Sequence, residues 1–187
     1  MSSSVSSGFS LDADGWLRGV RRVPSPNCDA RPAGCDIRFV VVHAISLPPD
    51  TFGGQDVDRL FTNTLDASAH PFFAEIAALR VSAHFLIARD GALTQYVSCL
   101  QRAWHAGASA WQGQVRCNDF SLGIELEGGD HLPFSERQYA VLRDLVALLR
   151  EAYPIVDVRG HAEIAPGRKT DPGPFFDWRR SALRRAC

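Results

Sequence analysis

The chain has 187 residues, of which 45% are hydrophobic and 22% charged, a composition typical of a globular protein that buries its own core. Its formal net charge of −1 argues against a protein that binds the phosphate backbone of nucleic acids or an anionic membrane surface. The longest aliphatic run, FVVV at 39–42, is far shorter than the roughly 20 residues of a spanning helix, so we expect no membrane segment.

The N-terminal region predicts neither a leader nor a fixed structure. The first 20 residues contain no apolar stretch after a basic start, which favours a cytoplasmic protein. Residues 1–14 begin with a serine-rich run and are expected to be disordered, so the folded domain is expected at 15–187. The cysteines include no C-x-x-C pair and indicate reduced thiols rather than a disulfide framework; they stand at positions 28, 35, 99, 117 and 187.

Two segments in the first half of the chain predict strands. Residues 37–45 (IRFVVVHAI) form an apolar, β-branched run of the kind found in strands buried on both faces, and His43 stands near its C-terminal end. Residues 82–97 predict two strands around a turn at Asp90 and Gly91, the strongest short-range hairpin signal in the chain. Short helices are expected at 56–63 and at 71–79.

The second half alternates a strand with helices. Residues 120–129 alternate apolar and polar side chains, which places Glu125 and Glu127 on the polar face of a strand. A helix is expected after Ser135, an N-cap candidate with a glutamine at the capping-box position, and it should end before Pro154. A last helix is expected at 175–186. Together the pattern predicts one α/β domain with a central mixed β-sheet flanked by helices.

The stretch GHAEIAPGRKTDPGPFFDW, 160–178, places His161, Lys169 and Asp171 on a segment too rich in proline and glycine for regular structure. Asp171 is a natural partner for His161, because Pro166 and Gly167 allow the loop to fold back. Three interpretations remain open on these residues alone: a solvated surface loop, a structural metal clip, or one wall of an active site.

The six histidines differ in how well their positions suit a metal site. A catalytic zinc ion needs three protein ligands and an open fourth position. His84 lies inside a predicted strand and is best interpreted as a hydrogen-bonded, partly buried side chain, while His70 and His131 lie in loops. Three remain at strand ends or in loops, where sheets present functional groups: His43, His105 and His161.

A resemblance to a known family adds weight to the active-site interpretation. The chain contains, in order, the runs RRVPSPN, VVHAISLPP, RAWHAGAS, RCNDFSLGIELEG and GHAEIAPGRKTDPGPFFDW, and from about Gly15 to Trp178 it resembles the AmpD family. Members of this family are cytosolic zinc amidases that recycle cell-wall fragments by cleaving 1,6-anhydro-N-acetylmuramyl-L-alanine peptides. The resemblance implies a central mixed sheet flanked by helices, shared with phage-type amidases and peptidoglycan-recognition proteins.

The resemblance also implies roles for individual residues. His43, His161 and Asp171 match the ligands of one zinc ion per chain, Glu125 matches the catalytic carboxylate, and Lys169 matches the catalytic lysine. Phage-type amidases commonly use a thiolate where Asp171 stands, so we expect an oxygen ligand to leave the zinc more Lewis acidic and more easily removed by chelators.

Substrate recognition rests on weaker matches. Arg80 and Arg116 match family arginines, and guanidinium groups suit the carboxylates of a peptide stem, although ordinary surface arginines look the same in a sequence. Trp104 fits a platform for the apolar face of a sugar, or equally a core side chain. Family members usually carry asparagine directly after the first zinc histidine, whereas this chain has Ala44, which leaves strict preference for the anhydro sugar open.

Three functions are therefore weighed. The first is a recycling amidase for anhydromuropeptides, which the resemblance links to β-lactamase induction and which needs no protein partner. The second is a broader N-acetylmuramoyl-L-alanine amidase. The third is a non-catalytic module that binds peptidoglycan fragments, a class whose members typically lose a metal ligand. The presence of all three matched ligands together with Glu125 and Lys169 favours an enzyme.

Overall fold

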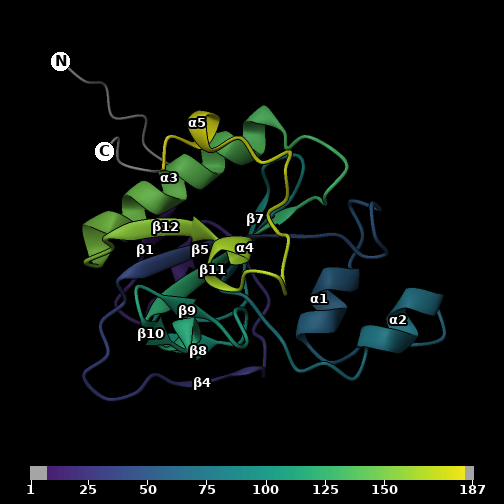
Figure 1. Cartoon of the computed structure of the whole chain (residues 1–187), viewed down its shortest axis with the longest axis horizontal. Helices are drawn as coiled ribbons and strands as arrows, with labels where there is room; N and C mark the ends of the chain where they lie inside the picture. The colour runs from purple at the N-terminus through teal and green to yellow at the C-terminus, as the bar shows by residue number, and fades with distance from the viewer. Residues whose placement is uncertain (1–7, 184–187) are drawn as a thin grey trace.

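The computed structural model describes residues 8–183, and its centre is a six-stranded mixed sheet (Figure 1). The first four strands in spatial order run parallel to one another, the fifth is antiparallel to the fourth, and the sixth is parallel to the fifth. In that order the strands are β12 (Asp157–Gly160), β5 (Phe39–Ile45), β11 (Ser121–Glu127), β6 (Phe85–Ile87), β7 (Leu93–Gln95) and β3 (Arg21–Arg22). The predicted α/β domain with a central mixed sheet is confirmed.

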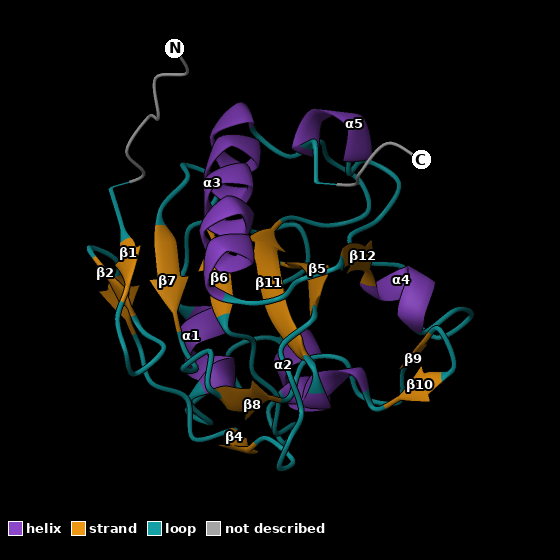
Figure 2. Ribbon diagram, turned by 90° about the vertical axis from the view of Figure 1, so that its left-hand side faces the viewer, coloured by secondary structure: helices purple, strands orange, loops and turns teal. Residues whose placement is uncertain are grey.

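The long helix α3 (Glu136–Ala152) covers one face of this sheet (Figure 2). Ser135 and Gln138 form the predicted capping box, because the side-chain oxygen of each accepts from the backbone N–H of the other. The buried stripe of the helix packs on alternate residues of β5 and β11 and consists of Tyr139, Leu142, Leu145, Val146 and Leu149.

Two short helices, α1 (Asp56–Phe61) and α2 (Pro71–Ile76), lie on the opposite side of the sheet from α3 (Figure 1). They share a second buried cluster with Ile45 and Leu86, whose side chains point away from α3. Both helices were expected, and both end two or three residues earlier than the sequence predicts. The ring nitrogen Nδ1 of His70 caps α2 by accepting from the backbone N–H of Phe72.

Several short elements complete the fold. The remaining paired strands are β1 (Ser10–Leu11) with β2 (Leu17–Arg18), β4 (Cys28–Ala30) with β8 (Gln101–Ala103), and β9 (Ala110–Trp111) with β10 (Gln114–Val115). The remaining helices are a 3-10 turn at Cys117–Asp119, α4 (His161–Ile164) and α5 (Trp178–Ser181).

The expected boundaries at both ends of the chain need correction. Disorder was expected to residue 14, but β1 pairs with β2, because Phe9 and Leu11 pack against the main core. Residues 1–7 lie outside the described part. The last helix is only α5, since Ala182 adopts a left-handed conformation with φ of 51° that ends it. Residues 184–187 of the expected helix are also outside the described part.

The face of β11 that carries Glu125 and Glu127 is buried rather than exposed to solvent. All seven residues of the strand are buried, including both glutamates. The parallel register pairs Glu125 with His43, so both side chains leave the sheet on the face opposite α3, near the carboxyl ends of their strands. Ligand sites of α/β sheets lie at this edge. No helix within residues 8–183 is long and apolar enough to cross a membrane.

Candidate metal centre and active site

Three side chains converge at the carboxyl edge of the sheet. His43 Nδ1 lies 3.0 Å from His161 Nδ1 and 3.0 Å from Asp171 Oδ2, and His161 Nδ1 lies 3.1 Å from Asp171 Oδ2. Ligands of a tetrahedral zinc ion with bonds of about 2.0–2.1 Å are about 3.3 Å apart. The three atoms therefore have nearly the spacing of one face of such a site.

The chain reaches this geometry through adjacent strands and a loop that folds back. His43 stands near the end of β5, and His161 directly follows β12, the parallel neighbour of β5. Asp171 returns to the same point because its backbone carbonyl accepts from the N–H of Ala162 at 2.8 Å. A Cβ at Gly160 would stand 2.7 Å from Pro172 Cδ, so the return of the loop requires glycine there.

The outer nitrogens of both histidines have partners. His161 Nε2 faces the Ala106 carbonyl at 3.1 Å, and because a carbonyl only accepts, this nitrogen carries the proton. Its Nδ1 lone pair then points at the cluster. His43 Nε2 contacts His105 Nδ1 at 2.9 Å. Histidines that bind metals characteristically use their second nitrogen in this way.

The charge states of the three groups suit a cation. Burial lowers the pKa of His43 to about 4, so its ring is neutral near pH 7. Burial alone would raise the pKa of Asp171, but its close contacts with His161 and His43 outweigh burial and hold that pKa below its ordinary value. Two neutral nitrogens and a carboxylate about 3 Å apart are favourable when a cation lies between them, so the residues fit a zinc ion.

Glu125 shares a cavity of about 220 Å³ with the three candidate ligands. Burial, and then the negative charge of Asp171, raise the pKa of Glu125 well above its ordinary value, while Lys169 opposes the shift. Its Oε2 is buried and has no hydrogen-bond partner among residues 8–183. A buried, unpartnered carboxylate beside a candidate metal site has the properties of a general base.

Glu127, two residues further along β11, has different partners. Its carboxylate accepts from the backbone N–H groups of Gly53 at 2.5 Å and Arg89 at 3.0 Å. It thereby ties two loops to the sheet. The two glutamates that share a face in the sequence pattern are thus distinguished by their contacts, and Glu125 is the one that lines the cavity.

Lys169 is exposed and lines both the cavity and a neighbouring groove of about 460 Å³. The groove has an apolar wall from α1 and α2, formed by Leu60, Phe72 and Ile76, and a polar end at 128–131. Ala44 borders both spaces and contributes no side-chain amide. Lys169 is also the only lysine in the chain, a sequence feature that sets it apart from the arginines and that the family motif does not use.

The three residues matched to substrate binding lie in different settings. Trp104 lines the cavity, and its Nε1–H donates to Asp29 Oδ1 at 3.3 Å. Arg80 is exposed and donates to the carbonyls of the two residues before it. Arg116 is exposed and pairs with Asp119 at 3.1 Å. Neither arginine lines the cavity or the groove.

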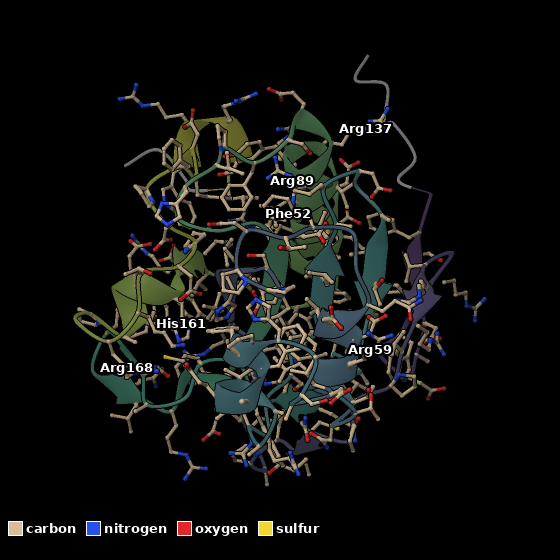
Figure 3. All side chains as sticks on the ribbon, turned by 90° about the vertical axis from the view of Figure 1, so that its right-hand side faces the viewer. Phe52, Arg59, Arg89, Arg137, His161 and Arg168 are labelled. Carbon is tan, nitrogen blue, oxygen red and sulfur yellow. The ribbon has the colours of Figure 1, made fainter. Side chains whose placement is uncertain are left out.

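Two further residues contact the cluster from outside. Arg168, at first sight a solvated loop charge, donates through Nη2 to the carbonyls of Ala106 at 2.8 Å and Ala108 at 2.7 Å, beside His161 (Figure 3). His105 contacts His43 and had no assigned role. His84 matches its structural interpretation, because its Nδ1 accepts from the N–H of Gly123 and its Nε2–H donates to the Gln101 carbonyl.

Comparison with known proteins agrees with this geometry. Residues 33–174 match the model of the family described as N-acetylmuramoyl-L-alanine amidase. The chain therefore belongs to this amidase family, which is the class of enzyme that the fold and the site define.

Within the family the chain groups with the AmpD amidases, as its motifs predicted. It is 58% identical over 168 residues to the 1,6-anhydro-N-acetylmuramyl-L-alanine amidase AmpD of Escherichia coli K12, covering 89% of this chain and 92% of that protein. A crystal structure of a selenomethionine AmpD derivative superposes with a TM-score of 0.90 at 56% identity, covering 92% of this chain and 97% of that one. The E. coli amidase AmiD in complex with anhydro-N-acetylmuramic acid-L-Ala-D-γ-Glu-L-Lys gives a TM-score of 0.59 at 30% identity, covering 94% and 65%.

Proposed function

We propose that this protein hydrolyses the amide bond between 1,6-anhydro-N-acetylmuramic acid and L-alanine in muropeptides, using one zinc ion held by His43, His161 and Asp171. The observation that carries the proposal is Glu125, a buried carboxylate with an unpartnered oxygen in the same cavity as the three candidate ligands. The names of the AmpD relatives and the substrate seen in the AmiD complex support the choice of substrate.

The residues of the cluster fit the donor set of a hydrolytic zinc site, which combines imidazoles with a carboxylate or a further imidazole. When bound, zinc supplies Lewis-acid polarisation of a carbonyl and a lowered pKa for water. His43 and His161 offer neutral nitrogens, and Asp171 offers a negative oxygen. An oxygen ligand in place of a thiolate favours a more Lewis-acidic and more easily chelated metal.

Glu125 would move the proton. It accepts a proton from the water that attacks the lactyl carbonyl carbon, and it delivers that proton to the nitrogen of L-alanine as the C–N bond breaks. Its raised pKa suits both halves of this transfer, because a carboxylate with an ordinary pKa is a weak base. The products are the free sugar acid and the peptide amine.

Lys169 would stabilise the negative charge that develops on the former carbonyl oxygen. It borders the cavity together with Asp171 and Glu125, so its ammonium group can approach the reacting carbonyl without a buried position of its own. For the substrate, we propose Trp104 as a platform for the sugar, held in place by Asp29. For Arg80 and Arg116 we propose contacts with carboxylates of the peptide stem outside the cavity and the groove, since neither arginine lines these spaces.

We further propose that the enzyme works in the cytoplasm on fragments that return during peptidoglycan recycling. Loss of the activity is then expected to raise the level of anhydromuropeptides, which the family resemblance links to β-lactamase induction. Measuring these fragments in cells with and without an intact Glu125 tests this role.

The proposal is tested by single-turnover hydrolysis of anhydromuramyl-tripeptide beside its reducing-sugar counterpart, with zinc-loaded and chelator-treated protein. Zinc-dependent cleavage of the anhydro compound alone is the expected result. Equal cleavage of both would favour the second candidate, a broader muramoyl-L-alanine amidase. The observation that favours this candidate is Ala44, which has no side-chain amide to contact the substrate. Binding without cleavage would leave only a recognition module.

A further inference from the structure

His105 lies between the metal cluster and the middle of β11. Its Nδ1 is 2.9 Å from His43 Nε2, and its Nε2 is 3.3 Å from Ser121 Oγ. Ser121 in turn donates its hydroxyl proton to the carbonyl of Cys117 at 2.6 Å. We call this series of contacts, from His43 through His105 and Ser121 to the Cys117 carbonyl, the His105 relay.

The donors and acceptors of the relay allow one order of protons. The Cys117 carbonyl only accepts, so the single hydroxyl proton of Ser121 is committed to it, and Ser121 Oγ can then only accept from His105 Nε2–H. A neutral His105 with its proton on Nε2 has a bare Nδ1, which accepts from His43 Nε2–H. The lone pair of His43 Nδ1 is thereby directed at His161 and Asp171.

The opposite order is unfavourable at both ends. If His105 carried its proton on Nδ1, its bare Nε2 would face an oxygen whose proton is already donated to Cys117. His43 would then accept at Nε2 and carry its own proton on Nδ1, which occupies the nitrogen that faces the cluster. The relay therefore selects the ring form of His43 that can bind a metal.

The chain makes room for this contact with a glycine in the middle of a strand. A Cβ at Gly123 of β11 would stand 2.5 Å from His105 Cγ and 2.7 Å from its Nδ1, distances that no real side chain occupies. Glycine inside a strand is unfavourable, and close approach of another group is a recognised reason for it. Gly123 stands between Ser121 and Glu125, so the strand that carries the proposed base also seats His105.

The backbone of the same segment orients the other histidine. Ala106, next to His105, provides the carbonyl that accepts from His161 Nε2. The Oδ1 of Asn118 accepts from the N–H groups of both His105 at 3.2 Å and Ala106 at 2.8 Å, which fixes the segment. One dipeptide thus contacts the outer nitrogens of both histidines in the cluster.

We propose that His105 is a positioning residue of the zinc site, which is held in one ring form by Ser121 and in turn sets the ring form and orientation of His43. The inference rests on the proposed zinc site, and it concerns metal binding rather than the hydrolysis itself. His105 does not need to touch the substrate in this role. Second-layer partners of this kind typically change metal affinity by about 10–100-fold when removed.

The test measures zinc affinity by competition with a chromogenic chelator, together with the visible absorption spectrum of the cobalt-substituted protein. His105→Phe removes the acceptor but keeps a planar ring, whereas His105→Asn keeps an oxygen acceptor near the position of Nδ1. We expect His105→Phe to weaken zinc binding by roughly 10–100-fold and to shift the cobalt spectrum, and His105→Asn to restore most of both.

Ser121→Ala tests the relay one step further from the metal. We expect it to weaken zinc binding by a smaller factor, with little further effect in the double variant with His105→Phe, because both act on the same series of bonds. Ser25→Ala is the matched control: Ser25 is also buried and donates to a carbonyl, that of Phe61, at 2.5 Å. It should lower the melting temperature of the metal-free protein as Ser121→Ala does, with zinc affinity unchanged.

Two results with the variants would overturn the inference. One is zinc affinity of His105→Phe within about twofold of the wild type, and the other is equal weakening by Ser25→Ala and Ser121→Ala, which would show a general effect on the fold. If His105→Phe does not fold, the two serine variants decide the question. If the variants lose zinc affinity as expected but the wild-type protein cleaves no amide, only the proposed function is overturned. A wild-type protein that binds no zinc would overturn both the proposed function and this inference.

Discussion

At the scale of single residues, the site depends on different contacts made by two glutamates on the same face of one strand. Glu125 and Glu127 point from the same face of β11, yet Glu127 accepts two backbone hydrogen bonds and Glu125 has an oxygen without a partner in the described structure. Periodicity predicted their shared face, and only the family motif favoured Glu125. The difference arises from Gly53 and Arg89, which are far away in the sequence, so spacing along the strand contains no trace of it.

Glu125→Gln should separate catalysis from stability. Loss of the general base is expected to lower kcat by about 10²–10⁴-fold with zinc still bound. The folded-state pKa of Glu125 is raised above the ordinary value of 4.5, so its contribution to stability is full below that value and is lost as pH rises through the folded pKa. The metal-free variant should therefore melt higher than the wild type at pH 7, and the difference should shrink toward pH 4.5.

This prediction is checked by thermal melts of metal-free wild type and Glu125→Gln across that pH range, with rates measured on the zinc-loaded proteins. Glu127→Gln is the comparison, because it weakens two hydrogen bonds to loops and should lower the melting temperature instead. A Glu125→Gln enzyme that keeps most of its activity would show that another group takes the proton.

Lys169 is the chain's single lysine, and every other side chain that is positively charged at neutral pH is an arginine. A lysine offers a compact charge, whereas an arginine presents a wide planar fork. We expect Lys169→Met to lower kcat by about 10²–10³-fold with KM and zinc affinity little changed, the usual cost of removing an oxyanion-stabilising group. Lys169→Arg should recover only part of the rate. An equal loss in zinc affinity would instead place Lys169 among the groups that shape the metal site.

At the scale of elements, the parallel register of β12, β5 and β11 places His43, His161 and Glu125 at one edge of the sheet. The sequence predicts β5, β11, the hairpin of β6 and β7 and the capped helix, because periodicity and turn residues are local signals, whereas the short strand β12 was not predicted. The loop that brings Asp171 back is a different case, since it depends on a backbone bond to Ala162 and on contacts with residues 106–108. Such contacts between distant segments also explain why His105 and Arg168 had no assigned role.

Arg168 joins the loop that carries Asp171 to the segment 106–108. Arg168→Gln should remove both carbonyl contacts, reduce stability by about 1 kcal/mol because the side chain is exposed, and lower zinc affinity several-fold. Faster hydrogen exchange at the Ala162 amide, which bonds to the Asp171 carbonyl, would report the loosened loop. Arg59→Gln, which removes an exposed ion pair in α1, is the control and should leave that amide unchanged.

At the scale of the whole molecule, the sheet separates two tasks. The face under α3 holds the main apolar core, while the opposite face carries the cluster, the cavity and the groove. The three candidate ligands come from β5, from the start of α4 and from the loop after it, so a bound ion would add a further link between these segments. Metal binding should therefore stabilise the fold as well as permit catalysis.

Zinc should raise the melting temperature of the chelator-treated protein. At free zinc about 100 times the dissociation constant, the stabilisation is about 2.7 kcal/mol, which corresponds to roughly 5–10 °C for a domain of this size. Differential scanning calorimetry with and without zinc measures the shift. In Asp171→Ala the shift should be much smaller, and an equal shift in that variant would indicate a zinc site elsewhere.

The central claim is that one metal ion at His43, His161 and Asp171 enables hydrolysis of the muramyl-L-alanine amide. Its most direct test is a titration of chelator-treated protein with zinc, in which the rate of anhydromuramyl-tripeptide cleavage is followed against zinc bound per chain. The account predicts a rate that rises in proportion and stops at one equivalent, with no rise in His161→Ala. Full activity in the chelator-treated protein, or an equal response of His161→Ala, would contradict it.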